Sequence, residues 1–181
     1  MKPLTQLAGI SAVALAAAVC LPSVTQATEP VPITFDFYFD QVDMAANVAS
    51  GTFTATSAIV NDTGTGVETY KLSPQNPQGE QTVHGVKTLS GTQGDIVLRM
   101  NVLFTPLAMP EPVILPDGRF GLIISGGTGR FVILSGTEAY ANLCGEGSTV
   151  ARLILIPPSD PNTPPAFALT GTYTGQAHFD P

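Results

Sequence analysis

The sequence predicts an all-β protein that folds as a single antiparallel β-barrel of about eight strands. Successive segments alternate apolar and polar residues with a two-residue period, which is the pattern of strands with one buried face. Clusters of glycine, proline, asparagine and aspartate separate these segments, and no convincing amphipathic helix follows residue 27. A short meander of strands most simply closes into a barrel, because closure removes exposed edges. A two-sheet β-sandwich is the alternative.

The first 27 residues are predicted to be a targeting segment rather than a part of the fold. Lys2 is followed by an apolar run over 7–21 and by small residues that end at Ala27. A short positive region, an apolar region shorter than a membrane span and a small residue at the end are typical of a secretory signal peptide. We therefore predict a signal peptide over 1–27, one mature domain over 28–181, and a secreted or periplasmic protein. An uncleaved membrane anchor is the alternative.

Five strands are expected in the first part of the domain. The clearest early one, 31–40, places four apolar side chains on one face and polar side chains on the other. Gly85 interrupts the alternation of a weaker strand and suggests a bulge there. The segment 61–66, rich in Asn, Asp and Gly, is expected to be a hairpin connection. The expected strands are 31–40, 51–60, 67–72, 81–89 and 95–104.

The second part of the domain is expected to complete the barrel with further strands. Four prolines in 105–118 predict a long irregular excursion, of the kind that is often functional or mobile. The sequence Gly126-Gly127-Thr128-Gly129 is expected to form a turn, and 157–165 is a proline-dense connector. The expected strands here are 119–125, an alternating run after Gly136, 148–156 and 166–179.

The net charge limits the possible partners, and the cysteine content limits how the fold can be stabilised. The formal net charge of −7 becomes −8 when Lys2 leaves with the signal peptide. Nucleic acids and anionic membrane surfaces attract clustered Lys and Arg, so this acidic charge disfavours both kinds of partner. We also expect no membrane insertion after the signal peptide is cleaved. Cys144 is then the one remaining cysteine, which excludes an internal disulfide, and stability must come from the core.

Three short segments carry a resemblance to a known family. They are the strand end Lys87-Thr88-Leu89-Ser90-Gly91, the strand Gly94-Asp95-Ile96-Val97-Leu98, and Ile124-Ser125-Gly126-Gly127-Thr128-Gly129-Arg130-Phe131. Over about residues 81–150 the chain resembles the allene oxide cyclase/dirigent-like β-barrel superfamily, in particular its secreted bacterial branch. The resemblance implies an eight-stranded antiparallel barrel whose lumen holds a small apolar ligand. It also implies dimers or trimers, and chemistry that needs no cofactor, since plant relatives cyclise an epoxide or steer radical coupling.

The chain also departs from that pattern. Val132 stands where the family usually has a small residue after the aromatic. The catalytic residues of the plant enzymes lie outside the matching segments, and none of them has a counterpart that we can place here. The family's activity therefore does not transfer to this chain.

Most familiar catalytic and metal-binding patterns are missing. The glycine run 126–129 lacks the Lys-Ser/Thr that would follow in a phosphate-binding loop, and it lies between strands rather than before a helix. His84 and His178 have no Cys or carboxylate at ligand spacing, so no metal site is expected. No Gly-x-Ser-x-Gly elbow is present to hold a nucleophilic serine. We expect no cofactor.

The remaining candidate site is the polar face of the segment after Gly136. If the even-numbered face of this segment looks into the barrel mouth, a phenol, an amide, a thiol and carboxylates converge there, where they can orient a ligand or act as acid and base. The alternative is that this face is solvated and that Ala139 and Ala141 pack inward; Cys144 is equally consistent with a buried small side chain. The candidate ligand-binding residues are Glu138, Tyr140, Asn142 and Cys144, joined by Arg99 and Tyr173 from neighbouring strands.

Three functions from different classes are consistent with these features. The favoured one is an exported barrel that binds a small apolar molecule in its lumen or a partner on its surface. The second is a cofactor-free cyclase or isomerase that relies on pocket shape and one or two polar side chains. The third is a structural scaffold with a filled lumen. An apolar open lumen favours the first, a buried acid–base pair in an open lumen the second, and a filled lumen the third.

Overall fold

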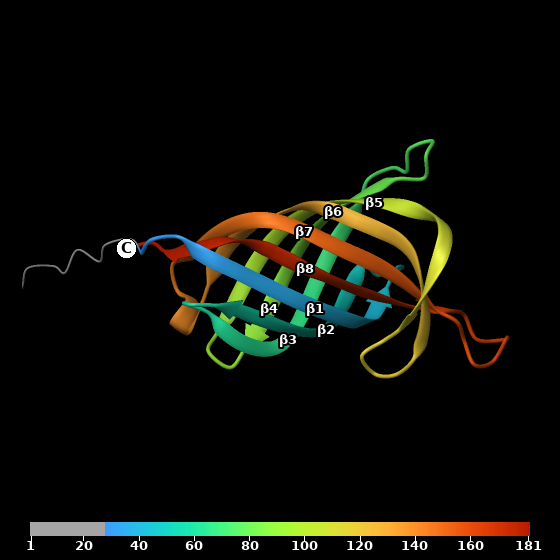
Figure 1. The fold of residues 1–181 in the computed structure, drawn as a ribbon, viewed down its shortest axis with the longest axis horizontal. Coiled ribbons are helices and arrows are strands. Elements are labelled where there is room, and N and C mark those ends of the chain that lie inside the picture. The colour runs from blue at the N-terminus through green and yellow to red at the C-terminus, as the bar shows by residue number, and fades with distance from the viewer. Residues whose placement is uncertain (1–27) are drawn as a thin grey trace, which may run out of the picture.

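The computed structural model describes residues 28–181, which form a closed antiparallel barrel of eight strands (Figure 1). Each strand pairs with the next one along the chain, and β8 pairs with β1 to close the barrel. The predicted barrel is confirmed and the sandwich alternative is wrong, whereas the predicted signal peptide lies outside the described residues. The elements are β1 (Val31–Asp43), β2 (Val48–Ser57), β3 (Asn61–Leu72), β4 (Gln81–Gly91), β5 (Asp95–Ile114), β6 (Phe120–Gly136), the short 3-10 helix η1 (Glu138–Tyr140), β7 (Leu143–Ile156) and β8 (Ala166–Phe179).

The two-residue alternation in the sequence becomes the inner and outer faces of the barrel. In β1 the side chains of Ile33, Phe35, Phe37 and Phe39 are all buried in the lumen, as their period predicts. The inner faces of the other strands add to the same core, so that apolar side chains fill most of the barrel. Aromatic rings dominate its middle: Phe131 stacks on Tyr173 with ring centroids 5.1 Å apart.

The expected loop at 105–118 is instead an extension of two strands. β5 continues to Ile114 and β6 starts at Phe120. The pairing register of β5 with β6 shifts between Pro106 and Glu111, and β4 pairs with β5 only as far as Phe104. One edge of β5 is therefore without a β4 partner beyond Phe104, and prolines are tolerated at an unpaired edge of this kind.

This β5–β6 extension, residues 107–123, lies against the outside of the barrel, and we call it the strap. It appears in yellow at the right of Figure 1. Its tip is fastened by Asp117, whose Oδ2 accepts a hydrogen bond from the Tyr38 hydroxyl at 3.0 Å and pairs with Arg119 Nη2 at 2.6 Å. The hydrogen bonds from Arg119 hold the pKa of Asp117 at about 2. A second apolar cluster joins the strap to the barrel, in which Leu115 and Ile123 of the strap pack with Ile154, Ile156 and Ala168.

Glycine-rich segments that suggested turns are built into strands. The segment 61–66 belongs to β3, and the connection before it is formed by 58–60. Gly126 to Gly129 lie within β6. Gly85 is paired in regular register with Tyr70 and Met100, so the predicted bulge there is wrong. These predictions failed because glycine also occurs inside strands, and Gly66, Gly85 and Gly127 make room there for large neighbouring side chains.

A pair of adjacent glycines tests this explanation. A Cβ on Gly127 would lie 2.8 Å from both Val102 Cγ1 and Phe104 Cε1, whereas a Cβ on Gly126 would meet no described atom within 4 Å. We expect Gly127→Ala to lower the free energy of unfolding by about 1–3 kcal/mol through overpacking. Gly126→Ala should change it by less than about 0.5 kcal/mol. Urea unfolding measures both, and equal effects would contradict the explanation.

A candidate ligand site in the barrel lumen

The lumen is open at one end, where it forms a cavity of about 230 Å³ that we call the mouth cavity. It lies at the end from which the 73–80 loop projects, drawn in green at the upper right of Figure 1. Gln75, Gln81 and Ser125 supply polar groups to its lining. Most of the wall is apolar and comes from six strands, through Val42, Ala49, Val83, Phe104, Leu153 and Leu169.

The opposite end of the lumen is closed by a hydrogen-bonded plug. Tyr140 of η1 is buried and donates a hydrogen bond from its hydroxyl to Asp62 Oδ2 at 2.8 Å. Asp62 also accepts hydrogen bonds from the backbone N–H groups of Thr63, Thr92 and Gln93, and one from the Thr92 hydroxyl. Burial of Tyr140 and its bond to Asp62 raise the pKa of this phenol. A ligand therefore has to enter from the mouth.

An ion pair buried in the lumen is the main chemical feature of this site. Glu68 of β3 lines the mouth cavity, and directly across from it in the pairing register stands Lys87 of β4. Glu68 Oε2 and Lys87 Nζ are 3.2 Å apart, and each side chain is only 1% exposed. Within residues 28–181 neither atom has a well-directed hydrogen-bond partner. A carboxylate is thus held at an apolar surface with spare hydrogen-bonding capacity.

Three aromatic rings surround the ammonium group of Lys87. Its Nζ lies 3.4 Å from the ring centroid of Phe37, 4.6 Å from that of Phe39 and 4.7 Å from that of Tyr173. Burial lowers the pKa of Lys87, and the negative charge of Glu68 opposes this shift. The ring faces also favour the charged form, because their quadrupoles attract a cation. The cation therefore has both a counter-ion and an aromatic cage.

Glycines in β3 and β4 make room for this ion pair and its cage. A Cβ on Gly85 would lie 2.8 Å from Met100 Cε and 3.0 Å from Glu68 Oε1. A Cβ on Gly66 would lie 2.7 Å from the Phe39 ring. The small residues that flank the pair in sequence are thus required by the large side chains of their neighbours.

The six predicted ligand-binding residues do not converge. Tyr173 points into the lumen, where burial and the charge of Glu68 raise its pKa, and Tyr140 belongs to the plug. Arg99, Glu138 and Asn142 are exposed.

Cys144 lies in β7, where its Sγ is 3.1 Å from Asp180 Oδ2. That hydrogen bond raises the pKa of the thiol. Leu143, next to it in the chain, is the residue that packs into the lumen core, so Cys144 does not share the inward face.

The strand expected after Gly136 is wrong in its first half. Residues 138–140 form η1, and β7 begins at Leu143. Glu138 and Asn142 have positive φ angles of 52° and 64°, so the chain turns sharply here instead of running straight. The alternative, with Ala139 and Ala141 inward, is also wrong, because both alanines are exposed.

Reasoning from the sequence missed Glu68 and Lys87, although a signal for them was present. Lys87 lies two residues before Leu89 and so shares its inward face, and Glu68 shares the inward face of Gly66 and Tyr70. A charged residue in phase with inward residues, on each of two consecutive strands, is the pattern of a buried cross-strand ion pair.

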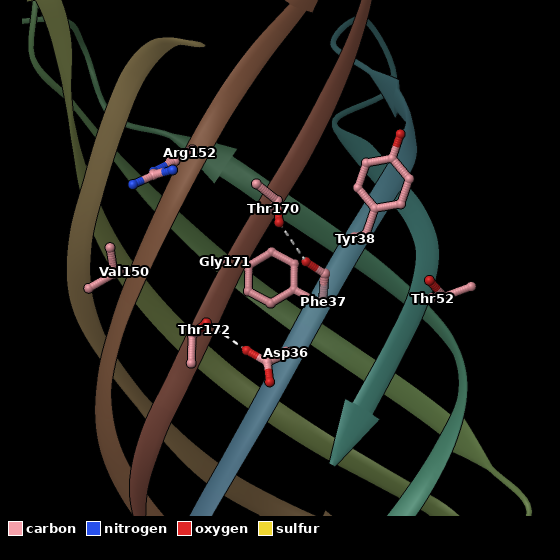
Figure 2. Close-up of a pocket in the computed structure, with 9 residues that line it drawn as sticks. All are labelled: Asp36, Phe37, Tyr38, Thr52, Val150, Arg152, Thr170, Gly171 and Thr172. Carbon is pink, nitrogen blue, oxygen red and sulfur yellow. Dashed lines mark hydrogen bonds between the residues drawn. The ribbon is translucent and has the colours of Figure 1, made fainter. Parts of the chain in front are cut away.

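A second hollow, of about 490 Å³, lies on the outer face of β1, β2, β7 and β8 (Figure 2). Thr172 donates a hydrogen bond to Asp36 Oδ1 at 2.6 Å, and Thr170 donates one to the Phe37 carbonyl oxygen at 3.1 Å. These polar groups therefore already have hydrogen-bond partners on neighbouring strands. Figure 2 places Arg152 and Tyr38 on opposite sides of this hollow. The outer hollow has no buried polar group that lacks a partner among the described residues, so it makes a weaker ligand site than the mouth cavity.

Two further findings concern metal ions and membrane spans. Within residues 28–181 no three His, Cys, Asp or Glu side chains gather in a way that suits a metal ion. No helix in that part of the chain has the length and apolar character needed to cross a bilayer.

Comparisons with known proteins identify no relative. The chain matches no protein-family model, no curated protein and no solved structure. The resemblance to the allene oxide cyclase/dirigent-like superfamily therefore stays a prediction.

Proposed function

We propose that this protein is an exported barrel that binds a small, mostly apolar molecule in the mouth cavity. The observation that carries the proposal is an open apolar cavity of about 230 Å³ with a buried carboxylate in its wall. At roughly 30 Å³ for each water-sized group, this volume holds a molecule of about eight such groups. Pockets that combine apolar walls with a few fixed polar groups are the usual form of small-molecule sites.

Binding is favoured over catalysis and over a purely structural role for specific reasons. A scaffold would need side chains that fill the lumen to both ends, whereas here the core side chains leave the mouth cavity open. A cofactor-free isomerase would need an acid and a base that both reach the substrate. Glu68 lines the cavity, but Lys87 does not, and its Nζ lies among three aromatic rings. Export, and dimers or trimers, stay predictions from the sequence and its resemblance.

Native mass spectrometry of the protein purified from its host tests the proposal directly. A bound species of defined mass, released when the protein is denatured, would support a lumen ligand and identify its class. An empty protein whose melting temperature does not respond to a library of small apolar compounds would overturn the proposal.

Two valines on β4 provide a matched pair of variants for the same test. Val83 lines the mouth cavity, whereas Val86 is 41% exposed. We expect Val83→Trp to weaken ligand binding at least about tenfold, because the indole occupies ligand space. Val86→Trp should bind as the unmodified protein does. Thermal melting of both variants establishes that they are folded, and equal binding by the two would place the ligand outside the mouth cavity.

A further inference from the structure

We infer that the ligand of the mouth cavity is uncharged and donates a hydrogen bond from its inner end, through a hydroxyl or amide N–H, to the carboxylate of Glu68. This inference rests on the proposed function and adds the chemical class of the ligand. The charges at the cavity wall are its basis.

Glu68 dominates the electrostatics of the cavity. Among the described residues that line the cavity it is the one with a charged side chain. The Tyr70 phenol, which also lines the cavity, lies 3.5 Å from the carbonyl oxygen of Asp43 and from Met44 Sδ, and is thus directed toward the β1–β2 turn. Gln75, Gln81 and Ser125 each donate a hydrogen bond to a backbone carbonyl oxygen. Among the described lining residues, Glu68 is therefore the one with a buried acceptor that lacks a partner, and the polar end of a ligand is expected to meet it.

An anionic ligand does not fit this wall. A carboxylate that enters the cavity meets the carboxylate of Glu68, which repels it in an environment of low dielectric constant. Lys87 cannot compensate, because it does not line the cavity and its Nζ already has Glu68 at 3.2 Å. Free fatty acids and other apolar acids are therefore disfavoured.

A cationic ligand does not fit either. The charges of Lys87 and Glu68 cancel, and three ring centroids within 4.7 Å of Nζ help to hold the ammonium in its charged form. An added ammonium group would leave one uncompensated positive charge in the apolar lumen, which is costly.

A ligand with no polar group fits poorly for a different reason, which is the hydrogen bonding of the Glu68 carboxylate. When it fills the mouth it closes the cavity over the carboxylate of Glu68, which is 1% exposed and whose Oε2 has no well-directed hydrogen bond from the described residues. A buried carboxylate without its hydrogen bonds is expensive, and a neutral donor restores one of them without adding charge. The neutral donor is therefore the class that the site accepts best.

Two constitutional isomers test this inference with few confounding differences. n-Octanol and heptyl methyl ether have the same atoms and similar size, but only the alcohol donates a hydrogen bond. By isothermal titration calorimetry we expect n-octanol to bind about tenfold more tightly or better, as a hydrogen bond to a charged group allows. Octanoic acid and octylamine should each bind more weakly than n-octanol at neutral pH.

Two double variants show whether Glu68 is the group that selects the ligand. Glu68→Gln/Lys87→Met removes both charges but keeps a carbonyl acceptor, and should keep a preference for the alcohol. Glu68→Leu/Lys87→Met removes the acceptor, and should bind the ether at least as tightly as the alcohol. Thermal melting verifies that both variants are folded.

The outcomes separate this inference from the proposed function. If the alcohol and the ether bind the unmodified protein equally, or if the acid or the amine binds best, the inference is wrong while the cavity remains a binding site. If the alcohol preference survives in Glu68→Leu/Lys87→Met, Glu68 is not the acceptor and the inference is also wrong. If none of the four probes binds and native mass spectrometry finds no ligand, the proposed function fails and the inference fails with it.

Discussion

Replacing Lys87 with methionine is expected to lower the free energy of unfolding by about 3–5 kcal/mol at neutral pH. The substitution keeps an unbranched side chain of similar length but leaves Glu68, which is 1% exposed, without its counter-ion. It also removes the cation that contacts the rings of Phe37, Phe39 and Tyr173. Urea unfolding followed by circular dichroism measures the loss.

The double variant Glu68→Leu/Lys87→Met is the control for that prediction. Replacing both partners of a buried ion pair with apolar side chains of similar size is often neutral, or stabilising by about 1–4 kcal/mol. We therefore expect the second substitution to restore most of the stability that Lys87→Met removes. If the double variant is as unstable as the single one, the loss comes from disturbed packing in the lumen, and our electrostatic explanation is wrong.

Replacing Asp62 with asparagine is the second change with a large expected effect, about 2–4 kcal/mol of destabilisation at neutral pH. The carboxylate is 5% exposed and accepts hydrogen bonds of 2.8–3.1 Å from Thr63, Thr92, Gln93 and Tyr140. An asparagine keeps the shape, but its NH₂ group faces donors where an acceptor is needed. The closed end of the barrel therefore loses part of its plug, and thermal unfolding measures the result.

The pH dependence of this effect follows from the pKa of Asp62. Burial raises that pKa, but the hydrogen bonds from Thr92, Tyr140 and Gln93 outweigh burial and hold it below its usual range. The stability from a carboxyl whose pKa is lowered on folding is complete above its unfolded pKa of about 3.9 and is lost as the pH falls further. The difference between the unmodified protein and Asp62→Asn should therefore shrink below about pH 4.

An exposed aspartate provides the matched control. Asp160, in the connection between β7 and β8, accepts hydrogen bonds from the backbone N–H and the side-chain amide of Asn162. Asp160→Asn should change the free energy of unfolding by less than about 0.5 kcal/mol at any of these pH values. A constant difference between Asp62→Asn and the unmodified protein down to about pH 3 would contradict the assigned role of the charge.

Strand identity could be read from the sequence wherever local alternation reports burial. The segments 31–40 and 95–104 show a clean two-residue period, and both lie within observed strands whose apolar faces fill the lumen. Prediction failed where one residue type has two structural uses. Pro110 and Pro112 suggested a loop because proline cannot donate a hydrogen bond within a central strand, but both lie in the strap, where one edge of β5 has no β4 partner.

The candidate site could be predicted less well than the fold. Tyr173 was expected to point into the barrel from a neighbouring strand, and its side chain is buried in the lumen core. Glu138 and Asn142 were assigned to a strand because the alternation continues through them, but the chain turns at both residues. Glu68 and Lys87 were missed because a charged residue in a strand is usually solvated, and the residue that neutralises it lies 19 positions away along the chain.

The sequence by itself determined that the described chain is a meander of strands and, for most of them, which side chains face inward, because the two-residue period of a strand is a local property. Only the tertiary structure decided that Glu68 and Lys87 stand opposite each other and that rings from β1 and β8 surround them. Alternation states which face a residue occupies but not its partner across the sheet. That partner is set by the pairing register and by the closure of β8 on β1, which bring together residues far apart in the chain.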